Sequence, residues 1–125
     1  MRTSFLLPVL LLGLVACSAS DDGASTDAAG ADALTVTVSD FMIDPSDLEV
    51  AGTTVTIDVV NDGPTPHNLS VRDADGEVVM ATEDLSTDET ETISAELEPG
   101  EYTIFCSLAG HESLGMSGTL NVSGS

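Results

Sequence analysis

Three side chains that bind soft metal ions stand close together in the C-terminal part of the chain: Cys106, His111 and Met116. The only other histidine, His67, lies far upstream, and the only other cysteine belongs to the N-terminal segment. A thiolate and a thioether favour Cu(I), whereas imidazoles also bind Cu(II), so this combination serves both oxidation states. The residue types and their spacing therefore predict a mononuclear site in which one copper ion, Cu(I)/Cu(II), transfers single electrons.

Each of these residues also has an ordinary structural role when it is considered alone. A single histidine is usually a surface or structural residue, a methionine usually fills a core, and a cysteine can be a buried, inert thiol. Zinc could also occupy a site of one cysteine and two histidines. The joint arrangement favours a metal site over independent structural residues, and the thioether favours copper over zinc.

The N-terminal segment, residues 1–16, predicts a lipoprotein signal peptide. Its apolar run is too short to span a bilayer, because about 12 helical residues reach roughly 18 Å against about 30 Å of hydrocarbon. Small residues then precede Cys17, as in a bacterial lipobox, where the cysteine is diacylated before cleavage. We therefore expect lipid attachment at Cys17 and a location at the extracytoplasmic face of the cell membrane, in the periplasm or at the cell surface. An ordinary signal peptide cut nearby and a Cys17–Cys106 disulfide are the alternatives.

Residues 17–33 predict an acidic, flexible linker. This segment is small and polar and has no large apolar side chain, so it cannot bury enough surface to offset the entropy of ordering it. A chain of about 16 residues has an r.m.s. reach of roughly 20–25 Å, enough to hold a small domain away from a membrane. Residues 34–125 are then the folded copper-binding domain.

The chain is strongly acidic, with a formal net charge of −20. Without residues 1–16, 22 acidic residues face Arg72 alone, which makes the formal net charge −21. Nucleic acid is therefore excluded as a partner, because phosphate binding needs clustered cations. We expect a redox protein with a basic docking surface, attracted over a long range that salt shortens. Solubility in a saline habitat would be an alternative reason for the acidity.

From Leu34 onward the chain reads as a series of short β segments. Residues 34–39 and 53–60 alternate apolar and polar side chains for most of their length, as half-buried strands do. Seven to eight strands in about 90 residues, with turn residues between them and no convincing helical period, predict an all-β, Greek-key β-sandwich. The other predicted strands are residues 48–50, 68–71, 77–80, 91–97, 101–106 and 118–122.

The strand that leads to Cys106 and the segment at residues 82–90 add detail to the predicted sandwich. Strand alternation puts Tyr102, Ile104 and Cys106 on one face, and the sequence from Pro99 to Tyr102 resembles a tyrosine corner, a feature of Greek-key sandwiches. Residues 82–90 are acidic and rich in Thr and Ser, so we expect a loop or one short helical turn outside the core.

The stretch from Leu34 to Val122 resembles a cupredoxin of the plastocyanin, auracyanin and halocyanin kind. The Cys-x4-His-x4-Met spacing is longer than that of plastocyanin and is closer to auracyanin-like members. The resemblance rests on Asp40-Phe-Met-Ile-Asp-Pro45, Leu48 to Ile57, Asn61, His67-Asn68, Tyr102-x-x-x-Cys106, Gly110-His111 and Gly115-Met116-x-Gly118-x-Leu120-x-Val122.

This resemblance implies a type 1 (blue) copper site. His67, Cys106 and His111 would bind the copper ion, and Met116 would supply a long axial thioether. Electrons would enter through the exposed edge of His111, inside an apolar collar. The residues that could form that collar are Pro64, Leu108, Ala109 and Leu114.

Four further residues would lie beside the ligands. Asn68 would tie the segment of His67 to that of Ser107, although simple turn capping by these two residues is an alternative. The carbonyl oxygen of Pro66 could approach the copper weakly. Phe105, beside Cys106, offers a second approach for electrons or merely covers the sheet.

These observations favour a membrane-tethered, extracytoplasmic one-electron carrier that is not an enzyme, since no histidine remains for a catalytic copper or a nucleophile–base pair. The expected partner is a c-type cytochrome or a respiratory or photosynthetic complex, and the protein is expected to be a monomer. Copper storage or delivery at the same site is the first alternative. An adhesive or structural sandwich with a vestigial site is the second.

Overall fold

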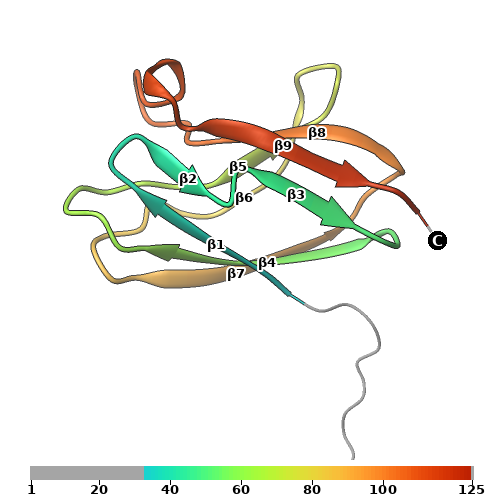
Figure 1. Cartoon of the computed structure of the whole chain (residues 1–125), viewed down its shortest axis with the longest axis horizontal. Coiled ribbons are helices and arrows are strands. Elements are labelled where there is room, and N and C mark those ends of the chain that lie inside the picture. Colours follow the sequence, from blue (N-terminus) through green and yellow to red (C-terminus); the bar gives the residue numbers. More distant parts are fainter. Residues whose placement is uncertain (1–32, 125) are drawn as a thin grey trace, which may run out of the picture.

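The computed structural model describes residues 33–124, which form a sandwich of two β-sheets (Figure 1). The expected all-β sandwich is confirmed, although the described residues form nine strands rather than seven or eight. The predicted signal peptide, residues 1–16, and the lipid-attachment residue Cys17 lie outside the described residues, as does nearly all of the linker at residues 17–33. The strands are β1 (Leu34–Ser39), β2 (Met42–Asp44), β3 (Asp47–Val50), β4 (Thr54–Asn61), β5 (Ser70–Arg72), β6 (Val78–Ala81), β7 (Thr90–Glu96), β8 (Gly100–Phe105) and β9 (Ser117–Val122).

The strands divide into a four-stranded sheet in the order β2–β1–β4–β7 and a five-stranded sheet in the order β3–β9–β8–β5–β6. Most neighbours are antiparallel, but β1 runs parallel to β4 and β3 runs parallel to β9. The connection from β8 to β9 contains the 3-10 helix η2 (Glu112–Leu114), the only helix among the described residues. Within that part of the chain, no helix is long and apolar enough to cross a membrane.

The extra strand is β2. It pairs antiparallel with β1, with Ser39 opposite Met42, and Ile43 is its buried side chain. Alternation is recognised over four to eight residues, so a strand of three residues is too short to be revealed by it. The other eight strands lie within two residues of their predicted bounds at each end.

The core lies between the two sheets and is built by strand alternation. In β4, Val55, Ile57 and Val59 are fully buried, while the residues between them are partly exposed. Val36 and Val38 of β1 are also fully buried. Burying each such side chain contributes about 1.5–3 kcal/mol relative to leaving it in water. The aliphatic alternation read from the sequence is therefore what holds the two sheets together.

The loop between β6 and β7 contains a core residue that its composition concealed. Residues 82–89 form a loop without a helix, but Leu85 is only 5% exposed and belongs to the hydrophobic core. Thr82 is buried as well, and its hydroxyl accepts a hydrogen bond from the amide of Leu69 at 3.1 Å. The expectation that this loop lies outside the core is therefore wrong at Leu85.

Gly118 allows β9 to lie close to the connection between β2 and β3. A Cβ atom at this position would lie 2.1 Å from the carbonyl oxygen of Ser46. The same oxygen accepts a hydrogen bond from the amide of Thr119 at 2.8 Å. This glycine is therefore required by a close backbone approach, which fixes β9 where it leaves the loop that carries Met116.

A tyrosine corner anchors the start of β8. The hydroxyl of Tyr102 donates a hydrogen bond to the carbonyl oxygen of Glu98 at 2.8 Å, and the ring is largely buried. The bond links the strand to the turn that precedes it, so the path of the chain into β8 is fixed.

Replacing Tyr102 by Phe should lower the free energy of unfolding by about 1 kcal/mol, because one intramolecular hydrogen bond is lost while the ring is retained. Urea unfolding of the metal-free protein, followed by circular dichroism, measures this change. Thr103→Val is the matched control, since it removes from the same strand a hydroxyl for which the structure describes no hydrogen bond. A loss no larger than that of the control would show that the corner contributes nothing.

Candidate metal centre

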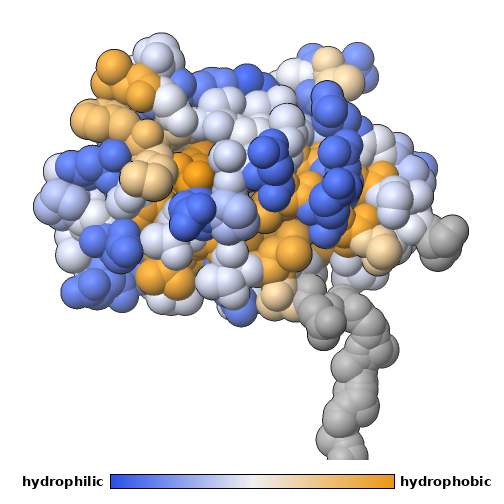
Figure 2. All heavy atoms as spheres, viewed as in Figure 1, coloured by the Kyte–Doolittle hydropathy of each residue, from blue (hydrophilic) through white to orange (hydrophobic). Residues whose placement is uncertain are grey.

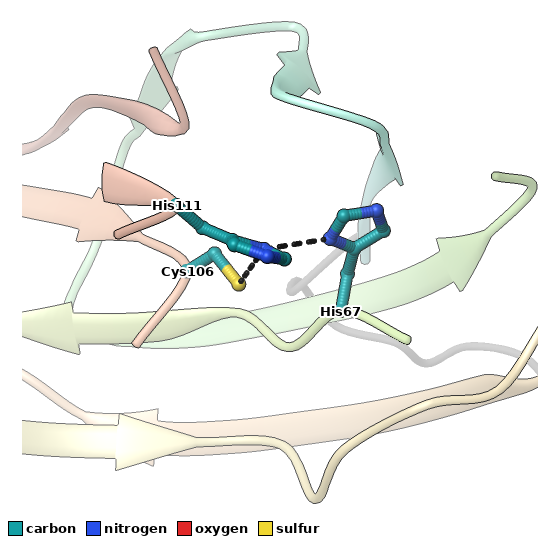
Figure 3. Close-up of side chains that lie close together, drawn as sticks. All are labelled: His67, Cys106 and His111. Atoms are coloured by element: carbon teal, nitrogen blue, oxygen red, sulfur yellow. Dashed lines mark hydrogen bonds between the residues drawn. The ribbon is translucent and has the colours of Figure 1, made fainter. Parts of the chain in front are cut away.

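Three of the four predicted ligands converge at one end of the sandwich. The ligand atoms of His67, Cys106 and His111 all lie within 4.8 Å of one another (Figure 3). Nδ1 of His111 is 3.2 Å from Nδ1 of His67 and 3.6 Å from Sγ of Cys106. His67 and Cys106 are fully buried, whereas His111 is partly exposed. Two distant stretches of chain thus deliver two imidazoles and a thiol to one small volume.

Met116 belongs to the same cluster through its backbone and its burial. Its carbonyl oxygen accepts a hydrogen bond from the amide of Cys106 at 3.1 Å, and its own amide donates to the carbonyl oxygen of His111 at 3.2 Å. Its side chain is fully buried. The loop from Cys106 to Met116 is therefore closed on itself, with its three ligand residues hydrogen-bonded through the main chain.

The donor set fits a copper ion. Neutral imidazole has one nitrogen with a free lone pair, and two Nδ1 atoms that face each other need a shared proton or a cation between their lone pairs. A thiolate beside two imidazoles, with a thioether nearby, is the ligand combination of electron-transfer copper sites. The cluster of His67, Cys106, His111 and Met116 is consistent with one copper ion.

His67 is held by the loop between β6 and β7. Its amide donates to the carbonyl oxygen of Leu85 at 3.1 Å, and the amide of Leu85 donates back at 2.7 Å. Asn61, which is fully buried, donates from Nδ2 to the carbonyl oxygens of Leu85 and Thr65, both at 2.8 Å. Its Oδ1 accepts from the amide of Gly63 at 2.9 Å. The side chain of Asn61 therefore satisfies the polar groups of the segment that leads to His67.

The structure brings Asn68 and Ser107 together across the two ligand segments. Nδ2 of Asn68 donates to the hydroxyl of Ser107 at 2.9 Å, and the amide of Ser107 donates to Oδ1 of Asn68 at 2.8 Å. These bonds connect the residue after His67 to the residue after Cys106, so they do more than cap a local turn. Pro66, which precedes His67, is exposed.

Phe105 is covered by the single Lys or Arg side chain of the described residues. The guanidinium of Arg72 lies 4.3 Å from the centroid of the Phe105 ring. It also pairs with Glu112, with Nη1 3.1 Å from Oε1, and this pairing holds the pKa of Glu112 below its usual range. Arg72 therefore joins β5 to the ligand loop, and Phe105, adjacent to Cys106, packs beneath it.

Asp40 and Thr65 contact His67 and were not predicted from the sequence. Oδ1 of Asp40 lies 3.0 Å from Nε2 of His67 and accepts a hydrogen bond from the hydroxyl of Thr65 at 2.7 Å. These hydrogen bonds, first from Thr65 and then from His67, hold the pKa of Asp40 below its ordinary value. Asp40 belongs to the motif Asp40–Pro45, on which the family resemblance partly rests. No local sequence pattern, however, could have predicted its contact with His67, which lies much later in the chain.

An apolar ring contacts the partly exposed histidine of the cluster, and other exposed apolar residues stand near these two in the sequence. The ring of Phe41 meets that of His111 edge-on, with centroids 5.6 Å apart. Phe41, Met42 and Leu114 are exposed by 48%, 54% and 61%. Figure 2 shows hydrophobic surface gathered at the end of the molecule where the loop before β9 lies. Of the other residues expected in the collar, Pro64 and Ala109 are exposed, whereas Leu108 is partly buried and packs against the core.

Cys106 is a free thiol within the described residues. The alternative disulfide with Cys17 involves a residue outside them, so it stays a prediction. An open cleft of about 570 Å³ adjoins this loop, between the residues that follow Cys106 and those that precede β9.

The sequence matches the family model of the cupredoxin-like domain over residues 7–122. No curated protein gives a significant match. Among solved structures, a dithionite-reduced auracyanin from Roseiflexus castenholzii aligns with a TM-score of 0.66 and 22% identity, covering 75% of this chain and 99% of that one. Auracyanin B aligns with a TM-score of 0.68 and 19% identity, covering 78% and 93%. A purple cupredoxin from Nitrosopumilus maritimus aligns with a TM-score of 0.56 and 22% identity, covering 72% and 99%.

At these identities the structural matches establish a shared fold, whereas the family model spans most of the sequence. The clustered His, Cys, His and Met side chains are typical of a type 1 copper site. Members of this family are electron carriers and not enzymes, in agreement with what the sequence predicted. The chain belongs to the cupredoxin family.

Proposed function

We propose that this cupredoxin is an extracytoplasmic, membrane-tethered one-electron carrier. The observation that carries the proposal is the convergence of two imidazoles and a thiol, of which only the imidazole of His111 is partly exposed. A buried centre with one exposed ligand edge suits electron exchange with a partner that docks at the surface. The tether is inferred from Cys17 and the apolar run before it.

In this proposal His67, Cys106 and His111 hold one copper ion, and Met116 supplies the weaker thioether. Bound copper supplies a Cu(I)/Cu(II) couple that carries one electron. The ligand residues are held by groups outside the cluster: Leu85 holds the backbone of His67, and the loop of Cys106, His111 and Met116 closes on itself. Ligands that are fixed in this way rearrange little between oxidation states, which favours fast transfer.

The same rigidity favours electron transfer over copper storage or delivery. Rapid release of copper would require the ligand loop to open. Two connections oppose that opening: Asn68 bonds to Ser107 at the start of the loop, and Arg72 pairs with Glu112 in its 3-10 helix. Copper delivery is therefore the outcome that the experiments below must distinguish from electron transfer.

We further propose that the partner is a protein with a basic surface around its own redox centre, such as a c-type cytochrome or a respiratory or photosynthetic complex. The net charge of −20 supports this choice, as does the apolar surface of Phe41 and Leu114 beside His111. A small apolar contact inside an acidic surround suits a brief encounter of a monomer with its partner.

Copper reconstitution tests the proposed function directly. The oxidised protein should bind one copper ion per chain, show an intense thiolate-to-copper band in the visible range, and cycle reversibly. Cys106→Ser should fold but lose that band, whereas Ser94→Ala, on the outer surface of β7, should keep it. A colourless oxidised protein would overturn the proposal. Fast transfer of the metal to a chelator with slow electron exchange would support copper delivery instead.

Replacing Met116 by Leu should retain copper but raise the reduction potential. Although a thioether is a soft donor, Cu(I) is stable with three ligands, whereas Cu(II) loses more stabilisation when its weak fourth ligand is removed. Each tenfold loss of Cu(II) affinity relative to Cu(I) corresponds to about 59 mV. Protein-film voltammetry measures the change, and Met80→Leu in β6 is the matched control. Complete loss of copper, or a potential equal to that of the control, would contradict this role.

Electron exchange with a basic c-type cytochrome should slow by tenfold or more as ionic strength rises, because the Debye length falls from about 30 Å at 0.01 M to about 8 Å at 0.15 M. Stopped-flow spectroscopy measures the rate. Leu114→Ser should slow exchange at every salt concentration by removing apolar docking surface, whereas Val78→Ser, exposed on β6, should not. A rate independent of both salt and Leu114 would refute the proposed docking surface.

A further inference from the structure

The imidazole of His67 has a defined partner on each of its two nitrogen atoms. Nδ1 faces Nδ1 of His111 at 3.2 Å, and the other ring nitrogen points away from the cluster (Figure 3). That outer nitrogen, Nε2, lies 3.0 Å from Oδ1 of Asp40. His67 is fully buried, so these contacts decide which nitrogen carries the proton.

The chemistry of Asp40 fixes the tautomer. An ionised carboxylate only accepts hydrogen bonds, so Nε2 of His67 must donate to it, and Nδ1 keeps its free lone pair. The hydroxyl of Thr65 donates to the same Oδ1 at 2.7 Å and lies 3.2 Å from Nε2. Both neighbours therefore direct hydrogen atoms at this one oxygen, which acts as the shared acceptor.

We propose that Asp40 is a positioning residue of the copper site, which orients His67, directs its Nδ1 to the metal and lowers the reduction potential. This inference rests on the proposed copper site. A carboxylate behind a ligating histidine fixes the orientation of the ring and makes it a more basic ligand. The added negative charge favours Cu(II) over Cu(I), because it stabilises the ion of higher charge more strongly.

The backbone around Asp40 is built to hold it in this place. The loop that leads to His67 approaches the turn between β1 and β2 so closely that a Cβ atom on Gly63 would lie 2.9 Å from Cα of Ser39. The amide of Asp62 also donates to the carbonyl oxygen of Val38 at 3.1 Å. Asp40 and His67 are therefore brought together by main-chain contacts as well as by their own hydrogen bond.

The next residue of the turn contacts the other imidazole. Phe41 has a φ of 60°, in the left-handed region that a bulky residue rarely adopts. Its ring packs edge-on against His111, at an interplanar angle of 74°. Its carbonyl oxygen would lie 3.3 Å from a Cβ atom on Gly115, at the end of the ligand loop. Two consecutive residues of one turn thus contact both histidines.

The tautomer can be read without copper. Because the chain has only two histidines, nitrogen-15 NMR of the metal-free protein should resolve the ring nitrogens of His67 and show the proton on Nε2. Asp40→Ala should give a mixture of tautomers. Asp40→Asn should largely keep the wild-type tautomer, because its amide oxygen can accept the same bond without the charge.

With copper bound, both variants should keep the visible band, because the ligands themselves are unchanged. Cu(II) affinity should fall about 10–100-fold, and a loss confined to Cu(II) raises the potential by about 59 mV for each factor of ten. Asp44→Asn is the matched control, since it removes the same charge from the neighbouring strand β2. Asp40→Asn keeps the experiment decisive if Asp40→Ala does not fold.

Two results would overturn the role of Asp40: a potential in Asp40→Asn no higher than in the Asp44→Asn control, or an unchanged tautomer in Asp40→Ala. In both cases the wild-type protein would still show the visible band, so the proposed copper site would stand. A wild-type protein that binds copper without that band would instead overturn the proposed function. The two failures are therefore distinguishable.

Discussion

The site depends on one constraint: the folded chain must hold two imidazoles and a thiol, which have no net attraction for one another in water, within 4.8 Å. His67 and Cys106 come from distant segments, so closing the chain between them costs conformational entropy before any metal binds. Packing of the core strands offsets that cost. Two side chains then fix the ligand segments by hydrogen bonds, Asn61 at the approach to His67 and Asn68 across to Ser107. Metal affinity and folding stability are consequently linked, because the unfolded chain has no such cluster.

Much of this arrangement is visible in the sequence, because strand alternation and the spacing from Cys106 to Met116 are local patterns. The residues that the sequence did not reveal make long-range contacts. Leu85 stands among acidic and hydroxyl side chains that are typical of surface loops. Its burial depends on distant residues, since it belongs to the core cluster and pairs with His67 through the main chain. Asp40 reaches His67 only because the β1–β2 turn lies beside a later loop. Strand β2 has only three residues, fewer than the four to eight over which alternation is recognised.

The placement of charge follows the same logic. Among residues 33–124, Arg72 is the one Lys or Arg, and it lies over Phe105 while pairing with Glu112 of the ligand loop. Both partners are about a third exposed, so the pair contributes little net stability. Its effect is geometric, because a planar guanidinium stacked on a ring and bonded to a carboxylate restricts the loop between them. The remaining charges of these residues are acidic, as the proposed docking of a basic partner requires.

His111 has to satisfy two opposing demands. In the proposed carrier it needs, as a ligand, a fixed ring in an environment of low polarity, and, as the exit for electrons, contact with the surface. The ring of Phe41 meets the first demand by packing against it edge-on, and the partial exposure of His111 meets the second. The exposed Leu114 adds apolar surface beside this edge, so a partner can displace water from it without forming many specific bonds. A contact of this kind is weak, which suits an electron carrier because its complex with a partner must dissociate quickly after transfer.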